Sequence, residues 1–209
     1  MSTLTVYSDY ACPWCYLGNA RIRRVLAAAR ARGESDFDAI EIVHFPLSPD
    51  TPKEGRDTLT YLRARGIPAE AATQRLAEMC QAEGLPYSTQ LEGKRIWNTQ
   101  RAQELALWAA EQLSPDALES LHASLFAAYH VDNRNLYDVE VLAEIASEVG
   151  LDADEARGIF DPDRYAALRR EHWDRAMGIG VRGVPTFVRG RQALVGAQPA
   201  EVMAEFVKS

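Results

Sequence analysis

Two cysteines separated by two residues are the side chains in this sequence best suited to chemistry. Cys12 and Cys15 stand at the junction between a β-rich run, residues 4–7, and a stretch of helical periodicity that starts near Pro13. If a helix begins there, Cys12 lies beside unsatisfied N–H groups and the positive end of the helix dipole, and both stabilise a thiolate. Cys15 follows about one turn later, within reach of the same sulfur. This pattern predicts dithiol–disulfide exchange.

The roles of the two thiols follow from their places on that helix. Cys12, with the lowered pKa expected at a helix N-terminus, is the predicted attacking or leaving sulfur, and Cys15 is the predicted resolving sulfur. Pro13 suits the first turn because it lacks an N–H group that would be unpaired there anyway. Pro13 and Trp14 lie between the thiols, and Trp14 could give a peptide substrate an apolar platform. We expect Cys15 to be the more buried thiol.

Two blander interpretations of the pair are half of a zinc site and an inert pair of thiols. A zinc site needs a second cysteine pair or histidines in reach. Cys80 stands alone in a helical run, where it is expected to be a small buried hydrophobe, and the four histidines show no ligand spacing. We therefore expect no metal, and no cofactor beyond the redox-active disulfide of Cys12 and Cys15.

Charged residues stand on both sides of the motif. The carboxylate of Asp9 could raise the pKa of a nearby thiol or relay the proton of Cys15, but a hydrogen-bonded cap of the loop is the favoured interpretation. Arg21, Arg23 and Arg24 follow the motif at positions typical of a solvated helix face.

The elements that must position the cysteines begin with a strand–helix–strand unit. Residues 4–7 form the first predicted strand, the helix runs to about Gly33, and residues 40–45 form a second strand that Pro46 ends. Such a crossover is right-handed and joins parallel strands.

A long helical block follows this unit. Alanine, leucine, glutamate and arginine dominate it, Ser114 before Pro115 is a good helix N-cap, and Gly150 is typical of a helix end. The predicted breaks between its helices lie near residues 66–68, 84–86, 114–115 and 161–162.

Strands return at the end of the chain. Residues 186–188 and 193–195 have the spacing of a hairpin with glycine in its turn, and a helix over 199–207 follows. The outer parts together make a minimal thioredoxin-like α/β fold, into which the helical block is inserted. The predicted limits are 1–55 with 179–209 for the thioredoxin-like domain and 56–178 for the all-helical insertion.

Val184 and Pro185 open the first of these late strands. A β-branched residue before proline is held extended, and proline is allowed at the first position of a strand. Most such prolines only open a strand, so this segment indicates a functional site only in combination with the cysteine pair.

Four segments of the chain resemble the FrnE-like branch of the DsbA family. They are Ser8 to Gly18, Phe45 to Asp50, Gly180 to Phe187 and Val195 to Gln198. The resemblance covers essentially the whole chain. It implies a thioredoxin fold with a helical insertion, Cys12 as the nucleophile and Cys15 as the resolving thiol. It also implies that Pro185 is cis and faces the disulfide, and that the Val184 backbone pairs with an extended substrate segment.

The same superfamily includes hydroxychromene-carboxylate isomerases and kappa-class glutathione transferases. These enzymes carry serine at the position of Cys12 and activate glutathione, so cysteine at both positions favours redox chemistry here. Asn98 and Thr99 nevertheless resemble a substrate-side segment shared across the superfamily. A glutathione-dependent isomerase or transferase of small aromatic or polyketide-like substrates is therefore one alternative, and a non-catalytic peptide-binding or chaperone protein is another.

Composition limits the partners and the setting. The 209 residues include 30 acidic and 23 basic side chains, and the net charge of -7 argues against nucleic-acid binding. No run approaches the roughly 20 apolar residues of a membrane helix, and no signal-peptide pattern opens the sequence. With only three cysteines, the chain is expected in the cytoplasm. The expected partners are protein or peptide disulfides and dithiols, with glutathione also open, for a monomer or homodimer.

Overall fold

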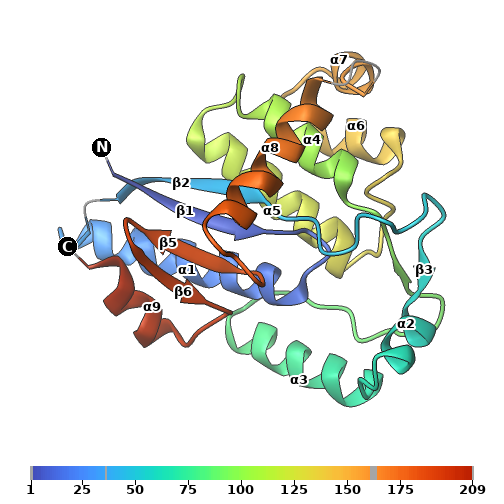
Figure 1. Ribbon diagram of the computed structural model, residues 1–209, viewed down its shortest axis with the longest axis horizontal. Helices are drawn as coiled ribbons and strands as arrows, with labels where there is room; N and C mark the ends of the chain where they lie inside the picture. The colour runs from blue at the N-terminus through green and yellow to red at the C-terminus, as the bar shows by residue number, and fades with distance from the viewer. Residues whose placement is uncertain (1, 36, 161–163, 209) are drawn as a thin grey trace. The chain divides into compact units, whose positions relative to one another are not determined.

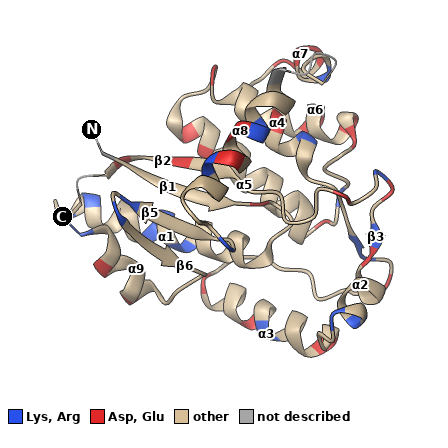
Figure 2. Cartoon of the chain, viewed as in Figure 1, with Lys and Arg blue, Asp and Glu red and all other residues tan. Residues whose placement is uncertain are grey.

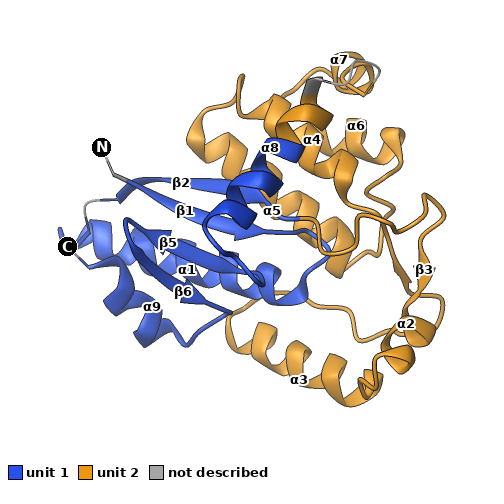
Figure 3. Cartoon of the chain, in the orientation of Figure 1, with its two compact units in different colours: residues 1–45, 170–209 blue, residues 46–169 orange. Residues whose placement is uncertain are grey.

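The structure, a computed structural model, describes residues 2–35, 37–160 and 164–208. Contacts divide the chain into two compact units, which Figure 3 distinguishes by colour. Unit 1 consists of residues 1–45 and 170–209, and unit 2 consists of residues 46–169.

Unit 1 is built on a mixed four-stranded sheet (Figure 1), whose strand order is β2-β1-β5-β6. The central strand β1 pairs in parallel with β2, and helix α1 connects the two, as the strand–helix–strand pattern predicts. On its other side β1 pairs antiparallel with β5, which forms a hairpin with β6. The bounds are β1 Ser2–Ser8, α1 Pro13–Ala31, β2 Phe37–His44, β5 Thr186–Arg189, β6 Gln192–Val195 and α9 Ala200–Val207.

Alternating side chains of β1 supply the two faces of this sheet. Leu4 and Val6 point into a core shared with α1 and α9, while Tyr7 points into a cluster on the opposite face. Such alternation is inherent to an extended chain. The second cluster is completed by Ala176 near the end of helix α8 (Arg164–Gly178) and by Val181 in the loop that follows. Both faces of β1 are therefore buried, and its C-terminal end leads directly into the cysteine motif.

Helices make up most of unit 2. Ser114 caps α5 through a hydrogen bond from the Ala117 amide to its hydroxyl oxygen, and Gly150 follows the end of α6 with a positive φ of 87°. Both features agree with the sequence prediction. The bounds are α2 Thr58–Ala64, α3 Ala69–Ala82, α4 Gln100–Ala109, α5 Pro115–His130, α6 Val139–Glu148 and α7 Ala153–Gly158.

The predicted helix breaks near residues 66–68, 84–86 and 114–115 fall between these helices, and the one near 161–162 lies outside the described residues. Unit 2 also contains a two-stranded sheet that the sequence does not predict, formed by β3 (Arg56–Asp57) and β4 (Arg95–Ile96). The expectation of an all-helical insertion is wrong in this respect, because the segment contains a short ladder besides its helices and loops.

The boundaries between the compact units lie after residues 45 and 169, whereas the predicted domain boundaries lie after residues 55 and 178. The loop after β2 belongs to unit 2 because Asn98 Nδ2 donates to the carbonyl oxygens of Thr51 (2.7 Å) and Pro49 (3.4 Å). The last two turns of α8 belong to unit 1 because Trp173 and Ala176 pack in the cluster around Tyr7.

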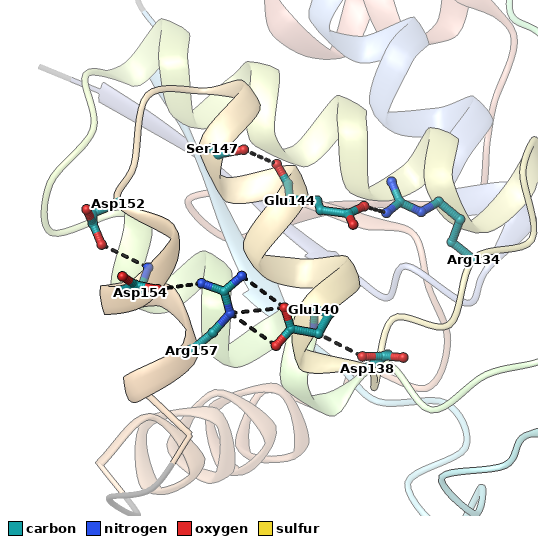
Figure 4. Close-up of polar contacts among 8 residues, drawn as sticks. All are labelled: Arg134, Asp138, Glu140, Glu144, Ser147, Asp152, Asp154 and Arg157. Carbon is teal, nitrogen blue, oxygen red and sulfur yellow. Dashed lines mark hydrogen bonds and ion pairs between the residues drawn. The ribbon is translucent and has the colours of Figure 1, made fainter.

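Charged residues of both signs are spread over the helices of each unit (Figure 2). The close-up in Figure 4 shows one network in unit 2, where the Arg157 guanidinium binds both carboxylate oxygens of Glu140 on α6 and also Asp154 on α7. Exposed ion pairs of this kind stabilise a fold little. Within the part of the chain that the structure describes, no helix combines the length and apolar character needed to cross a membrane.

Candidate active site

Cys12 is the N-cap residue of α1. Its backbone is extended (φ -86°, ψ 114°), and Pro13 occupies the first turn of the helix. The Cys12 carbonyl oxygen accepts from the amides of Cys15 (3.0 Å) and Tyr16 (3.1 Å). The Cys12 sulfur also accepts from the Cys15 amide at 3.3 Å. The sulfur therefore stands where the first turn of a 19-residue helix presents its N–H groups and its positive dipole end. This is the position that the sequence predicts.

Cys15 lies in the first turn of α1 and is fully buried, whereas Cys12 keeps 4% of its surface exposed. Burial raises the pKa of the Cys15 thiol well above its ordinary value, and the neighbouring Cys12 sulfur raises it further. Hydrogen bonds from the Asp9 backbone and the Ser8 hydroxyl partly oppose this rise in the pKa. No disulfide bond joins Cys12 and Cys15 in the structure.

Val184 and Pro185 lie beside the cysteine pair. The Val184–Pro185 peptide bond is cis, as expected, and the Cys12 thiol donates to the Val184 carbonyl oxygen at 3.6 Å. The two segments meet because β5 begins at Thr186, which pairs with Tyr7 near the end of β1. A hydrogen bond of 2.8 Å from the Gly196 amide to the Pro185 carbonyl holds the loop after β6 against the same proline.

Gly18 allows α1 to approach this proline closely. A Cβ atom at Gly18 would lie 2.9 Å from Pro185 Cγ and 3.5 Å from the Ala197 side chain. Any larger residue would therefore have to displace the proline ring. The helix backbone one turn beyond the cysteines is thus in direct contact with the Pro185 loop.

The loop between β1 and α1 is closed by Asp9. Its carboxylate oxygen Oδ1 accepts from the Ala11 amide at 3.2 Å, and its carbonyl oxygen accepts from the Cys12 amide at 3.1 Å. The Asp9 side chain is buried. These contacts are those of a loop cap, the interpretation favoured from the sequence.

Trp14 is 39% exposed, and Pro13 is partly exposed, so both are open to an incoming molecule beside Cys12. Asn98 and Thr99 lie in unit 2, where both are buried. Asn98 holds the loop after β2 and accepts from the Gln100 amide at 2.9 Å, so its side chain has a structural role. The role of these four residues in binding a substrate stays a prediction.

Sequence reasoning missed three buried polar residues of this site. Arg21 is buried instead of solvated, and its guanidinium donates to the carbonyl oxygens of Ala197 (3.1 Å) and Gln198 (2.6 Å). Ser8 and Asn19 are buried next to Cys15. The signal for Asn19 was its position four residues after Cys15, on the same face of the helix.

Cys80 is fully buried on α3, as expected for a small hydrophobe. Within the described residues, no group of three or more histidine, cysteine, aspartate or glutamate side chains is placed to hold a metal ion.

Comparison with known proteins relates the whole chain to one family. A family model described as the DSBA-like thioredoxin domain matches residues 3–208. Among solved structures, the probable DsbA oxidoreductase SCO1869 from Streptomyces coelicolor is similar with a TM-score of 0.86 and 35% sequence identity, covering 99% of this chain and 88% of that chain.

Two more distant solved structures share the fold. The cytosolic disulfide reductase DsbM from Pseudomonas aeruginosa, solved with GSH, has a TM-score of 0.66 and 20% identity, covering 98% of this chain and 96% of that chain. A 2-hydroxychromene-2-carboxylate isomerase has a TM-score of 0.68 and 15% identity, covering 98% of this chain and 93% of that chain.

Proposed function

Since the chain belongs to the family of DSBA-like thioredoxin domains, we propose that it catalyses thiol–disulfide exchange through Cys12 and Cys15. The observation that carries the proposal is the placement of the Cys12 sulfur. It lies at the N-terminus of α1, 3.6 Å from the Val184 carbonyl oxygen and one turn from a second thiol. A helix N-terminus favours a negative group, and a thiolate is the form of cysteine that attacks a disulfide.

In the proposed reaction, the Cys12 thiolate attacks one sulfur of a substrate disulfide. A bond forms between Cys12 and that sulfur, and the other substrate sulfur leaves as a thiolate and takes up a proton. Cys15 then attacks Cys12, releases the second substrate thiol and leaves the Cys12–Cys15 disulfide. The substrate gains two electrons and two protons, which the two thiols of the protein lose. The reverse sequence oxidises a dithiol.

The proposed substrates are disulfides or dithiols of proteins and peptides. The support is the position of the Val184 carbonyl beside Cys12 and the exposed indole of Trp14, because an extended peptide needs backbone partners and an apolar surface. Pro13 and Pro185 would border the same sulfur. Asn98 and Thr99 are proposed to contact substrate only on the strength of the sequence resemblance.

Glutathione is proposed as the reductant that returns the Cys12–Cys15 disulfide to the dithiol, two glutathione thiols being oxidised for each disulfide reduced. The fold shared with DsbM, a cytosolic reductase solved with GSH, supports this assignment. We accordingly propose work in a reducing cytoplasm, where reduction or isomerisation of disulfides is the favoured direction.

The test is exchange with a peptide disulfide, followed for the wild type and three single variants. Cys12→Ser should abolish exchange, and Cys15→Ala should stop at a mixed disulfide on Cys12 that mass spectrometry can identify. Cys80→Ala is the matched control, because Cys80 is equally buried but lies on α3 in unit 2, and it should react as the wild type does. Exchange that survives in Cys12→Ser would contradict the proposal.

A glutathione-dependent isomerase is the second candidate, favoured by the fold shared with 2-hydroxychromene-2-carboxylate isomerase. Cys12→Ser separates the two candidates. Glutathione-dependent isomerisation of a small aromatic substrate would survive a serine at this position, whereas thiol–disulfide exchange would not. A purely peptide-binding protein would keep its affinity for peptides in Cys12→Ser and show neither reaction.

A further inference from the structure

Two buried polar side chains lie behind the resolving thiol. Ser8 ends β1 and is 2% exposed, and Asn19 lies one turn after Cys15 on α1 and is 4% exposed. The Asn19 amide nitrogen Nδ2 is 3.0 Å from Ser8 Oγ and 2.9 Å from the Cys15 carbonyl oxygen. One side chain therefore joins the end of the strand to the turn of the helix that carries Cys15.

The orientation of the Asn19 amide follows from these contacts. A carbonyl oxygen only accepts hydrogen bonds, so the group that faces the Cys15 carbonyl must be the NH2 group. The same nitrogen then donates to Ser8 Oγ and occupies one of its lone pairs. The hydroxyl hydrogen of Ser8 can therefore be donated to a different acceptor. The Cys15 sulfur is such an acceptor, and the hydrogen bond from the Ser8 hydroxyl acts to lower the pKa of the Cys15 thiol.

This orientation has a cost. Asn19 Oδ1 is buried and has no hydrogen-bond partner among the described residues. An unpaired buried acceptor destabilises a fold, but turning the amide over would bring this oxygen against the Cys15 carbonyl oxygen, which can only accept. The hydrogen bonds from Asn19 Nδ2 to Ser8 Oγ and to the Cys15 carbonyl oxygen thus hold the amide in one orientation.

We propose that Ser8 and Asn19 are positioning residues for the resolving step, in which Asn19 directs the Ser8 hydroxyl to the Cys15 sulfur and the hydroxyl stabilises the thiolate that attacks Cys12. This inference rests on the proposed thiol–disulfide exchange. In the step, the bond between Cys12 and the substrate sulfur breaks as the Cys15–Cys12 bond forms. The proton lost by Cys15 balances the proton gained by the departing substrate thiolate, and Ser8 keeps its own proton throughout.

The two steps can be timed separately with Ellman's reagent, an aromatic disulfide that releases a coloured thiolate. Reduced protein mixed with one equivalent should release one thiolate when Cys12 attacks and a second when Cys15 resolves the mixed disulfide. Ser8→Thr and Ser8→Val form the matched pair, because they share a shape and differ only in the hydroxyl. We expect the second phase to be at least about tenfold slower in Ser8→Val than in Ser8→Thr, since a hydrogen bond to a charged group is lost, with the first phase the same in both.

Two further variants provide a second test and a control. Asn19→Leu, similar in size but without the amide, should also slow the second phase alone. Thr58→Val in unit 2 removes a different buried hydroxyl, one with no partner among the described residues, and should change neither phase. Thermal unfolding of each variant identifies any that fail to fold, and Asn19→Leu then replaces Ser8→Val in the comparison.

The outcomes separate the two proposals. Loss of the second phase in the wild type itself would overturn thiol–disulfide exchange by the pair. Two phases in the wild type, with equal second phases in Ser8→Thr and Ser8→Val, would overturn the positioning role alone. Equal slowing of both phases in Ser8→Val would also overturn it, because a general disturbance of the site would then explain the effect.

Discussion

The backbone amide of His44 donates to the ring nitrogen Nδ1 of His172 over 3.1 Å, and the two rings stack with centroids 5.5 Å apart. The bond joins the end of β2 to α8, and it requires Nδ1 of His172 to be unprotonated. Burial lowers the pKa of His172 from its ordinary 6.5; Arg175 lowers it further, while Glu41 opposes both. The ring of the buried Tyr10 is tilted against that of His44, with the two centroids 5.9 Å apart.

We predict that unit 1 loses stability as the pH falls below about 6.5. Unfolded His172 takes up a proton from that pH downward, before the folded residue does, so the unfolded state binds more protons and the free energy of unfolding decreases. The variant His172→Gln keeps an acceptor that does not titrate, and its stability should change less over the same range. Urea unfolding between about pH 7.5 and 5.5 measures the difference. Parallel pH profiles for the two proteins would show that His172 is not responsible.

Iodoacetamide should modify Cys12 first in the reduced protein near neutral pH. Cys12 stands at the helix N-terminus and keeps some exposed surface, whereas Cys15 and Cys80 are fully buried and burial raises the pKa of Cys15. We expect labelling of Cys12 to be at least about tenfold faster than that of either other thiol, because burial limits access to both and disfavours the reactive thiolate of Cys15. Mass spectrometry of timed samples gives the order, and Cys12→Ser provides the background rate. Early labelling of Cys15 or Cys80 would refute the assignment.

The variant Gly18→Ala should slow thiol–disulfide exchange although it changes neither cysteine. Its new methyl group would lie 2.9 Å from Pro185 Cγ, so the proline ring or the helix has to shift. We expect a loss of about 1–3 kcal/mol in the free energy of unfolding and a slower reaction of Cys12. Gly158→Ala is the matched control, because a Cβ atom there meets nothing within 4 Å, and its stability should be equal or slightly higher. If Gly18→Ala behaves like Gly158→Ala, the contact with Pro185 does not position the site.

Local pattern predicted the part of the site that depends on local structure. A strand, a turn and a helix with proline in its first turn place Cys12 at the N-cap and Cys15 one turn later, and neighbouring residues alone determine this. The contact of Cys12 with Val184 could not be derived in that way. It depends on β5 pairing with β1, and the prediction came from a family resemblance instead of from the residues.

The polar residues behind the site were harder to predict because their partners are distant in the sequence. Arg21 has the spacing of a solvated face beside Arg23, yet its guanidinium is buried by the loop that carries Ala197. The same limit applies to β3 and β4 in unit 2. Each has two residues, too few for any alternation, and their pairing unites segments that the helices α2 and α3 separate.

The hydrogen bond from Cys12 to Val184 joins residues 172 positions apart, which has a consequence for how the protein is made. Chains are synthesised from the N-terminus, so both thiols leave the ribosome long before β5 exists. Until β5 pairs with β1, the Val184 carbonyl is absent from the Cys12 sulfur, and oxidants in the cell can reach an unsheltered thiol pair. A chain that terminates before β5 carries both thiols without the Val184–Pro185 loop, so the centre is complete only after that loop has been synthesised.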